Sequence, residues 1–372
     1  MTQTYTAAQM LDRLVGFASV VGQPNGHIVD FIREYLTGHD ITCHVIAGPE
    51  GDRSNLFATI GDGARSGYVL SGHLDVVPAG EPEWQADPFV LRQSGDRLIG
   101  RGACDMKGFV AAVLAMAPRL AALDLRAPIH IALSYDEEAG CIGVPHLLSA
   151  LPDLCAPPLG AIIGEPSGMV PVLAHKGKAA LQLVARGQSG HSSRPDLGAN
   201  AIHALLPALS AAAAQAQDLM SGPNDDRFAP PWSSVQIGTV SGGQAVNIIP
   251  DRVCAQLEAR AIAGVDPRDL MAPILGACGV TVQAQWLSTY PALALDPTHP
   301  LADLTARLSC NAPLGAVSYG TEAGLFQQAG VPAIICGPGD IARAHRPEEY
   351  LTLAELEAAA QMVLALGAHL QN

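Results

Sequence analysis

The first 170 residues alternate between two hydrophobic patterns. Apolar residues recur every three or four positions through 7–37, which predicts two helices separated by a turn at 22–26. Short, nearly continuous apolar runs predict buried strands, and a helix rich in small residues is predicted at Phe109–Leu123. The predicted strands are Thr42–Ile46, Asn55–Ile60, Tyr68–Leu70, Ile129–Leu133 and Ala161–Ile163. Buried strands that alternate with helices predict an α/β fold with a mostly parallel sheet flanked by helices.

The glycine-rich segment GDGARSG at 61–67 separates two of these predicted strands. Its composition is similar to that of a phosphate-binding loop, but it lies between strands and opens no helix. We therefore predict a hairpin turn at this position.

The segment from 178 to 288 has a different order of elements. Its pattern predicts strand, helix, strand, strand, helix and strand, which is the order of a ferredoxin-like α+β domain. The strands are Ala179–Ala185, Ser234–Val240, Val253–Ala261 and Thr281–Trp286, and the helices are Ala199–Met220 and Asp266–Leu275. The chain then returns to a helix, a strand at Ala333–Cys336 and a final helix from Thr352. We predict a main domain formed by 1–174 and 291–372, with an inserted domain at 175–290.

Composition and charge narrow the function classes. The chain has 372 residues, 49% hydrophobic and 15% charged, which indicates a folded protein with a well-buried core. A net charge of −14 without a basic run argues against nucleic acid or an anionic membrane as a partner. The eight cysteines are scattered without a C-x-x-C pair, and the N-terminus shows no signal-peptide pattern. We therefore expect reduced thiols and a cytoplasmic location.

Histidines and acidic residues collect where the predicted strands of the main domain end. The candidates are His73, Asp105, Glu137, Glu138, Glu165 and His345. Taken singly, each has a structural alternative, such as a helix N-cap or a solvated turn. Together, two histidines and several carboxylates form a ligand set for Zn²⁺, with Co²⁺ or Mn²⁺ as alternatives. Six positions are too many for one tetrahedral ion but suit two divalent ions that share a carboxylate.

Asp75 follows His73 at a spacing that lets its carboxylate reach the ring nitrogen that is not used for a metal. A metal-bound histidine nearly always has such a partner, which sets its tautomer. We therefore predict that Asp75 orients His73.

Five segments resemble, in order, the motifs of the dinuclear metallohydrolase family that includes aminoacylases, carboxypeptidases, succinyl-diaminopimelate desuccinylases and acetylornithine deacetylases. The segments are HLDVVP (73–78), GRGACDMKG (100–108), DEEAG (136–140), GEPS (164–167) and AHRPEEY (344–350). The resemblance extends over the whole chain, including the inserted domain. It implies a zinc-exopeptidase type of main domain that is catalytic and binds metal, with an inserted lid and dimerisation domain.

Carried over by position, the resemblance assigns a role to each candidate. It makes His73, Asp105 and Glu165 the ligands of one metal, and Asp105 bridges to a second metal. The other ligands of that second metal are Glu138 and His345. Glu137 becomes the general base, which takes a proton from the metal-bridging water and hands it to the leaving amine.

In the inserted domain, GQSGHSSRP (187–195) resembles the lid segment of the family. The matching histidine, His191, is implied to reach across a homodimer and stabilise the oxyanion. Asn247 and Arg260 match positions that contact the substrate in relatives, and Arg260 suits an α-carboxylate. The resemblance also implies closure of this domain about hinges near 172–178 and 288–292.

Within the family, SYGTEAGLF (318–326) and GPGDIARAHRPEEYL (337–351) resemble the acetylornithine deacetylases more than the desuccinylases. This implies hydrolysis of N²-acetyl-L-ornithine to L-ornithine and acetate, a step of arginine biosynthesis. Glu322 suits a cationic substrate side chain, or alternatively stabilises a helix N-terminus. A deacylase or dipeptidase for another N-acyl amino acid (N-acetyl-citrulline, N-acetyl-methionine or N-succinyl-diaminopimelate) stays open, as does a non-catalytic metal- or peptide-binding relative.

Overall fold

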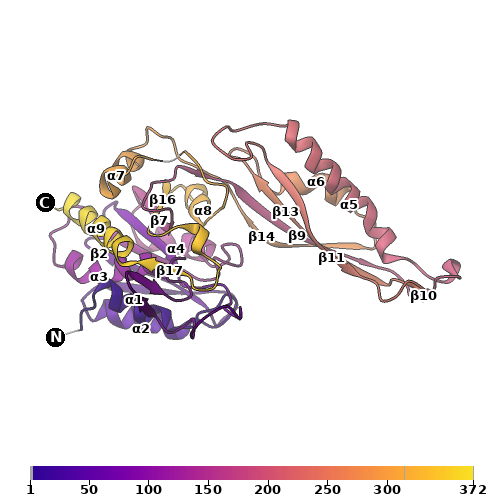
Figure 1. Ribbon diagram of the computed structural model, residues 1–372. Coiled ribbons are helices and arrows are strands. Elements are labelled where there is room, and N and C mark those ends of the chain that lie inside the picture. Colours follow the sequence, from indigo (N-terminus) through magenta and orange to yellow (C-terminus); the bar gives the residue numbers. More distant parts are fainter. Residues whose placement is uncertain (1–2, 314, 372) are drawn as a thin grey trace. The chain divides into compact units, whose positions relative to one another are not determined.

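The computed structural model describes residues 3–313 and 315–371, and the chain divides into two compact units (Figure 1). The first unit comprises the chain up to Leu173, Leu295–Gly315 and the chain from Thr321 onward. The second unit comprises Ala174–Ala294 and Ala316–Gly320. The catalytic and lid roles that the sequence suggests for the two domains stay predictions.

The first unit is built on a six-stranded sheet with the order β1-β2-β6-β3-β7-β16. Its strands are β1 (Thr42–Ala47), β2 (Ser54–Ile60), β3 (Tyr68–His73), β6 (Ile129–Ser134), β7 (Gly160–Pro166) and β16 (Ala333–Gly337). Strands β6, β3, β7 and β16 run parallel, while β1 and β2 join antiparallel at one side. The mixed α/β class with a mainly parallel sheet is therefore confirmed.

Helices flank this sheet and share its core. They are α1 (Ala7–Val15), α2 (Gly26–Thr37), α3 (Lys107–Ala121), α4 (Val144–Leu154), α7 (Pro300–Ser309), α8 (Ala323–Gln328) and α9 (Leu353–His369). Alternate residues of β6, such as Ile129, Ile131 and Leu133, point into one hydrophobic cluster with α1, α2, α3, α7 and α9. The final helix begins where the sequence predicts, because Thr352 and Glu355 form a capping box at its N-terminus.

The predicted hairpin between β2 and β3 is wrong. Strand β6 lies between them, antiparallel to β2 and parallel to β3. The glycine-rich segment at 61–67 is therefore a connection between strands that are not neighbours. A turn sequence reports only local conformation, whereas the strand that separates β2 from β3 comes about 60 residues later in the chain.

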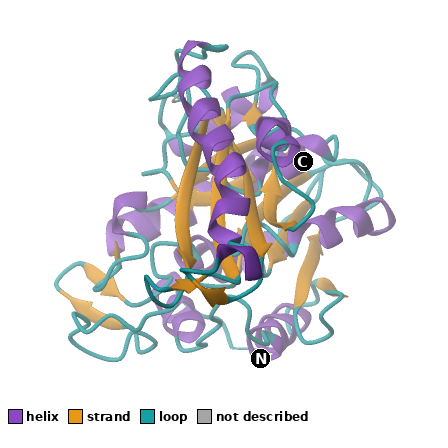
Figure 2. Cartoon of the chain, turned by 90° about the vertical axis from the view of Figure 1, so that its right-hand side faces the viewer, coloured by secondary structure: helices purple, strands orange, loops and turns teal. Residues whose placement is uncertain are grey.

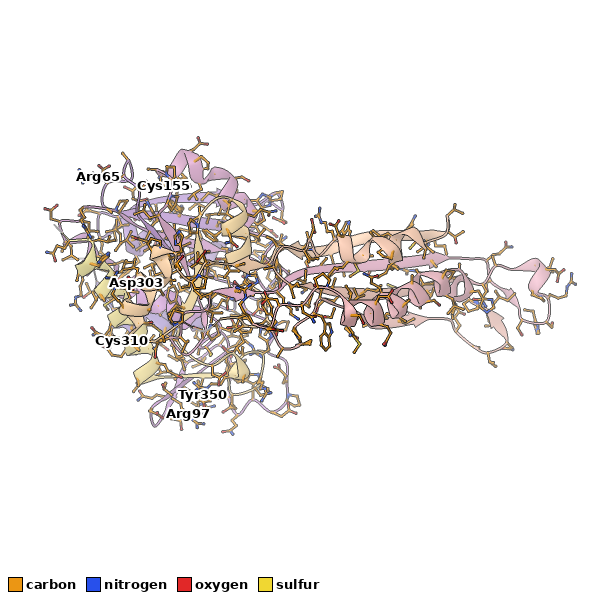
Figure 3. All side chains as sticks on the ribbon, turned by 90° about the horizontal axis from the view of Figure 1, so that it is seen from above. Arg65, Arg97, Cys155, Asp303, Cys310 and Tyr350 are labelled. Atoms are coloured by element: carbon orange, nitrogen blue, oxygen red, sulfur yellow. The ribbon has the colours of Figure 1, made fainter. Side chains whose placement is uncertain are left out.

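The first unit also contains a small three-stranded sheet. Its strands are β4 (Arg92–Ser94), β5 (Arg97–Ile99) and β17 (Tyr350–Thr352). Strand β5 pairs antiparallel with β17, and the Arg97 guanidinium lies 4.3 Å from the centre of the Tyr350 ring (Figure 3). This sheet joins the segment that precedes Gly100 to the segment that follows His345.

The second unit is a four-stranded antiparallel sheet with the order β11-β13-β9-β14. Its elements are β9 (Gly177–Arg186), α5 (Ala201–Asp218), β11 (Ser234–Gly242), β13 (Arg252–Ala261), α6 (Ala272–Gly276) and β14 (Val282–Tyr290). This order along the chain and across the sheet is that of a ferredoxin-like domain. Figure 2 shows the long helix α5 running along the strands, and its apolar side packs on them.

Short elements complete the described chain. Paired two-residue strands are β8 (Ala174–His175) with β15 (Leu293–Ala294) and β10 (Gly190–His191) with β12 (Ile248–Ile249). Single 3-10 turns are Pro195–Leu197, Leu219–Ser221, Asp269–Met271 and Ile341–Arg343. No helix among the described residues combines the length and the apolar character needed to cross a membrane.

The predicted helix Asp266–Leu275 is shorter in the structure. The α-helical part is only Ala272–Gly276, preceded by one 3-10 turn. Pro273 has no N–H to donate within a longer helix, so it occupies the first turn instead.

Candidate metal centre

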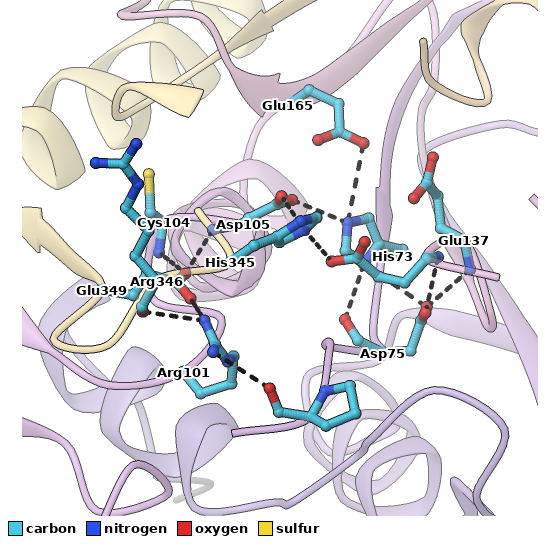
Figure 4. Close-up of polar contacts among 12 residues, drawn as sticks. His73, Asp75, Arg101, Cys104, Asp105, Glu137, Glu165, His345, Arg346 and Glu349 are labelled. Atoms are coloured by element: carbon cyan, nitrogen blue, oxygen red, sulfur yellow. Dashed lines mark hydrogen bonds and ion pairs between the residues drawn. The ribbon is translucent and has the colours of Figure 1, made fainter. Parts of the chain in front are cut away.

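The carboxyl ends of the parallel strands bring the predicted ligands of the first unit together (Figure 4). His73 is the last residue of β3, Glu165 lies near the end of β7, and Glu137 and Glu138 follow β6. Asp105 lies just before α3, and His345 lies in the loop between β16 and β17. Ligands of α/β folds bind at this edge of the sheet because the loops from several strands meet there.

Asp105 lies between the two histidines. Its Oδ1 is 3.1 Å from His73 Nε2, and its Oδ2 is 3.4 Å from His345 Nε2. His345 Nε2 is also 3.0 Å from Glu138 Oε1, and His73 Nε2 is 3.9 Å from Glu165 Oε1. Each oxygen of one carboxylate thus faces a different group of ligands. This arrangement suits a carboxylate that bridges two ions.

The charges of the cluster fit divalent cations. His73, Asp105 and Glu165 are buried, and ligand atoms of His73, Glu137 and Glu165 lie within 4.8 Å of one another. Burial, together with the negative charges of Asp105 and Glu137, raises the pKa of Glu165 well above its usual value. Burial and repulsion from Glu138 likewise raise the pKa of Glu137 to about 8. Bound cations would relieve this repulsion, and the oxygen and imidazole donors suit Zn²⁺, Co²⁺ or Mn²⁺.

Asp75 orients His73 through its main chain rather than its side chain. The His73 Nδ1–H donates to the carbonyl oxygen of Asp75 at 2.9 Å, which leaves Nε2 free to face Asp105. The Asp75 carboxylate is farther away, at 3.6 Å from Nδ1. Its two oxygens instead accept the backbone N–H groups of Glu137 and Glu138, both at 3.0 Å. Asp75 therefore positions both the His73 ring and the backbone of Glu137 and Glu138.

Glu137 has a neighbour that the motif does not reveal. The buried Cys141 thiol donates to Glu137 Oε1 at 3.3 Å. Burial raises the pKa of the Cys141 thiol well above its usual value, so it stays a neutral donor. A neutral donor leaves the Glu137 carboxylate free to accept a proton from a water molecule.

Backbone conformation also shapes the centre. Adding a Cβ to Gly108, three residues after Asp105, would place it 2.6 Å from the carbonyl oxygen of Ala103, so the backbone approaches closely here. His345 has a φ of 59°, a left-handed conformation that few non-glycine residues adopt. The buried Cys104 thiol donates to the carbonyl of Asp340, and burial raises its pKa.

The structure adds a positioning residue that sequence reasoning missed. Asp136, the residue before the acidic pair, is buried with a φ of 49°. Its Oδ1 accepts the N–H of Gly22 at 2.8 Å, and its Oδ2 pairs with Arg53. The only local signal was its place at the end of a buried strand.

Glu322 is placed differently from its predicted role. It is 1% exposed, and its two oxygens accept the hydroxyls of Ser71 at 2.6 Å and Ser134 at 2.7 Å. Burial raises the pKa of this carboxyl group. Because both oxygens are occupied within the core of the first unit, this placement does not support contact with a substrate cation. Its position at the start of α8 agrees with the structural alternative.

His191 and Asn247 lie together in the second unit. The β10–β12 pair joins the two segments, and Ser192 donates its N–H to the carbonyl of Asn247 at 3.0 Å. Both side chains are exposed, and a cavity of about 740 Å³ lined by Ser192, Asn200 and Gly243 adjoins them.

Arg260 lies on β13 of the four-stranded sheet, at the end of that strand farther from the β10–β12 pair. It is separated from Arg252, at the start of β13, by eight residues, or about 26 Å of extended chain. Its guanidinium donates to both oxygens of Glu258, at 2.7 and 3.2 Å, and to the Tyr290 hydroxyl at 3.2 Å. The roles of His191, Asn247 and Arg260 in binding substrate stay predictions.

Comparison with known proteins identifies the fold and the family of the chain. A M20 family metallo-carboxypeptidase from Sulfolobus solfataricus superposes with a TM-score of 0.77 at 18% identity, covering 98% of both chains. The mainly parallel sheet is of the zinc-exopeptidase type of fold. Residues 69–369 match the family described as peptidase family M20/M25/M40. The chain belongs to this family of metallohydrolases, which confirms the family expected from the five motifs.

Two relatives are similar over most of their length. The acetylornithine deacetylases of Proteus mirabilis (strain HI4320) and Klebsiella pneumoniae (strain 342) are 31% and 32% identical to this chain over 349 residues. The alignments cover 90% and 88% of this chain and 87% of each relative.

Metal binding should stabilise the folded chain. After removal of metal with a chelator, saturating Zn²⁺, Co²⁺ or Mn²⁺ should raise Tm by roughly 5–10 °C, because about 2.7 kcal/mol is gained at a hundredfold excess over Kd. His73→Ala should lose most of this rise, while His44→Ala, on the exposed face of β1, should keep it. Equal rises in both variants would contradict a metal centre at His73.

Proposed function

We propose that this chain is a metal-dependent amide hydrolase that removes the acetyl group from N²-acetyl-L-ornithine, yielding L-ornithine and acetate. The observation that carries the proposal is the position of Asp105 between two ligand groups, with Glu137 beside them. The two acetylornithine deacetylases that align over most of the chain support the choice of substrate.

In this proposal, some residues of the first unit bind the metal ions and Glu137 transfers the proton. His73, Asp105 and Glu165 would hold one ion, and Asp105, Glu138 and His345 the other. Two such ions would polarise the acetyl carbonyl and lower the pKa of a water molecule. Glu137 takes a proton from the water molecule while the water oxygen adds to the acetyl carbon. It then gives that proton to the nitrogen, and the C–N bond breaks to release acetate and the amino acid.

Residues of the second unit would act on the substrate. His191 would donate to the oxyanion, Asn247 would hydrogen-bond the substrate, and Arg260 would pair with its α-carboxylate. Pairing of Arg260 with a substrate carboxylate would require its guanidinium to exchange Glu258 for the ligand.

Loss of the proposed base should affect turnover rather than metal binding. Glu137→Gln keeps the size of the side chain but cannot accept the proton, so kcat should fall by about 10²–10⁴-fold. Metal affinity should change little in this variant, whereas Glu138→Gln, which alters a proposed ligand, should weaken it. The comparison requires kcat together with metal titration of both variants. A Glu137→Gln enzyme that keeps more than a third of its kcat would rule Glu137 out as the base.

Substrate choice is best settled by direct competition among the candidates. With Zn²⁺ or Co²⁺ present, kcat/KM for N²-acetyl-ornithine should exceed the values for N-acetyl-methionine, N-acetyl-citrulline and N-succinyl-diaminopimelate at least tenfold, about 1.4 kcal/mol of discrimination. A clear preference for another compound would favour the alternative of a deacylase or dipeptidase for a different N-acyl amino acid. Metal binding without turnover of any compound would favour the non-catalytic alternative.

We also propose that the chain forms a homodimer through the edge strand β11. Seven successive residues of β11, Gln236–Gly242, are exposed, and none of them is charged. An unpaired, uncharged edge strand is a ready partner for the same strand of a second copy. At the opposite edge, the Arg268 guanidinium covers Trp286 of β14 at 5.6 Å and places a charge there.

A two-fold dimer would also explain the spread of predicted substrate residues. His191 lies in the β10–β12 pair, just beyond the end of β9, whereas Arg260 pairs with Lys178 at the start of β9, so one copy of the second unit does not bring them to one small substrate. Antiparallel pairing of β11 with its symmetry copy places the His191 end of one sheet beside the Arg260 end of the other.

An edge lysine should separate the two copies. Val240→Lys, at a residue of β11 that is 53% exposed, should convert a dimer to a monomer in light-scattering measurements. Leu287→Lys is the matched control, because Leu287 is 39% exposed on the opposite edge strand and should leave the dimer intact. A wild-type chain that is monomeric at micromolar concentration would refute this proposal.

A further inference from the structure

Arg101 and Glu349 form a buried ion pair beside the metal centre. Arg101 Nη1 lies 2.8 Å from Glu349 Oε2, and each side chain is 1% exposed. Neither residue is among the proposed ligands. The function proposed above assigns no role to this pair, although two charges are withdrawn from water to form it.

Glu349 holds the backbone that carries Asp105. Its Oε1, the oxygen that does not face Arg101, accepts the N–H of Cys104 at 2.9 Å and the N–H of Asp105 at 3.0 Å. Asp105 is the residue whose two oxygens face the two histidines. A shift of this backbone would therefore change the distances to both ligand groups.

Arg101, which pairs with Glu349, also bonds to two other segments of the chain (Figure 4). Its Nη1 also donates to the carbonyl of Arg346, the residue after His345, at 3.3 Å. Its Nη2 donates to the carbonyl of Pro78, at the end of the segment that begins with His73, at 3.2 Å. The planar guanidinium can make these bonds at once, which an ammonium group on a lysine cannot do with the same geometry.

Stability alone is a weak reason for such a pair. Withdrawing two charges from water costs about as much as their attraction returns, so apolar residues of similar volume often give equal or greater stability. Apart from the bonds of Arg101 to Pro78 and Glu81, the bonds of this pair end on the main chain at or next to Asp105 and next to His345. Their distinctive property is the geometry that they impose on these two residues.

We propose that Arg101 and Glu349 are positioning residues that hold Asp105 and His345 at the spacing required for binding divalent ions. The proposal rests on the metal centre of the proposed function. It predicts that the pair affects metal affinity separately from the stability of the metal-free fold.

The test compares metal affinity with the stability of the metal-free protein. Arg101→Lys and Glu349→Gln should bind Zn²⁺ and Co²⁺ about 10–100-fold more weakly in competition with a chromogenic chelator. The visible absorption of bound Co²⁺ should change as well, because it reports coordination geometry. Glu348→Gln is the matched control: Glu348 is the adjacent residue, pairs with Arg92 and is 25% exposed, so its affinity should stay within twofold of wild type.

A double variant keeps the test decisive if a single substitution prevents folding. Arg101→Met combined with Glu349→Leu removes both charges, so no unpaired charge is left buried. It should fold with a somewhat lower metal-free Tm, because the N–H groups of Cys104 and Asp105 lose their acceptor, and it should bind metal at least tenfold more weakly. Folded variants with wild-type affinity and an unchanged Co²⁺ spectrum would overturn this proposal alone. A wild-type protein that binds none of the ions would overturn the metal centre as well.

Discussion

The first unit gathers carboxylates of like charge in a buried space, and much of its local structure serves to make this possible. Charges in a medium of low polarity repel strongly and lose their hydration, so carboxylates there tend to take up protons. Burial and the neighbouring carboxylates raise the pKa values of Glu137 and Glu165 in this way. Asp105 is the exception, because hydrogen bonds from His345 and His73 outweigh its burial and lower its pKa.

Around this space, two further buried carboxylates are stabilised by hydrogen bonds from the main chain. The Asp75 and Glu349 carboxylates accept backbone N–H groups, and Glu349 also pairs with Arg101. These compensated groups hold the main chain in place. Among the described residues, the central carboxylates have no arginine or lysine partner. Asp105 and Glu138 face His345, and Asp105 and Glu165 face His73, so they lie against the other proposed ligands. The positioning carboxylates thus hold backbone N–H groups, whereas the proposed ligand carboxylates face histidines.

Many features of the fold and of the metal centre could be predicted from the sequence, where a local motif or a repeated hydrophobic pattern indicates them. The hydrophobic pattern predicts the parallel strands, and the order of acidic residues behind them predicts one cluster, since such strands end at one edge. Residue chemistry alone left other points open. It could not tell whether Asp75 acts through its carbonyl or its carboxylate, because both belong to one residue and differ only in geometry. Nor could it show that Glu322 is buried between Ser71 and Ser134, because these residues are distant in the chain.

The sequence by itself determined the class of fold, the family and the set of candidate ligands, because periodicity and motif spacing are properties of short segments. The tertiary structure decided which strands are neighbours, as the placement of β6 between β2 and β3 shows. It also decided the partners of buried charges, such as Arg101 and Glu349, which are 248 residues apart. The physical reason is that an ion pair is set by distance in space and by exclusion from water. Neither is a property of the neighbouring residues in the chain.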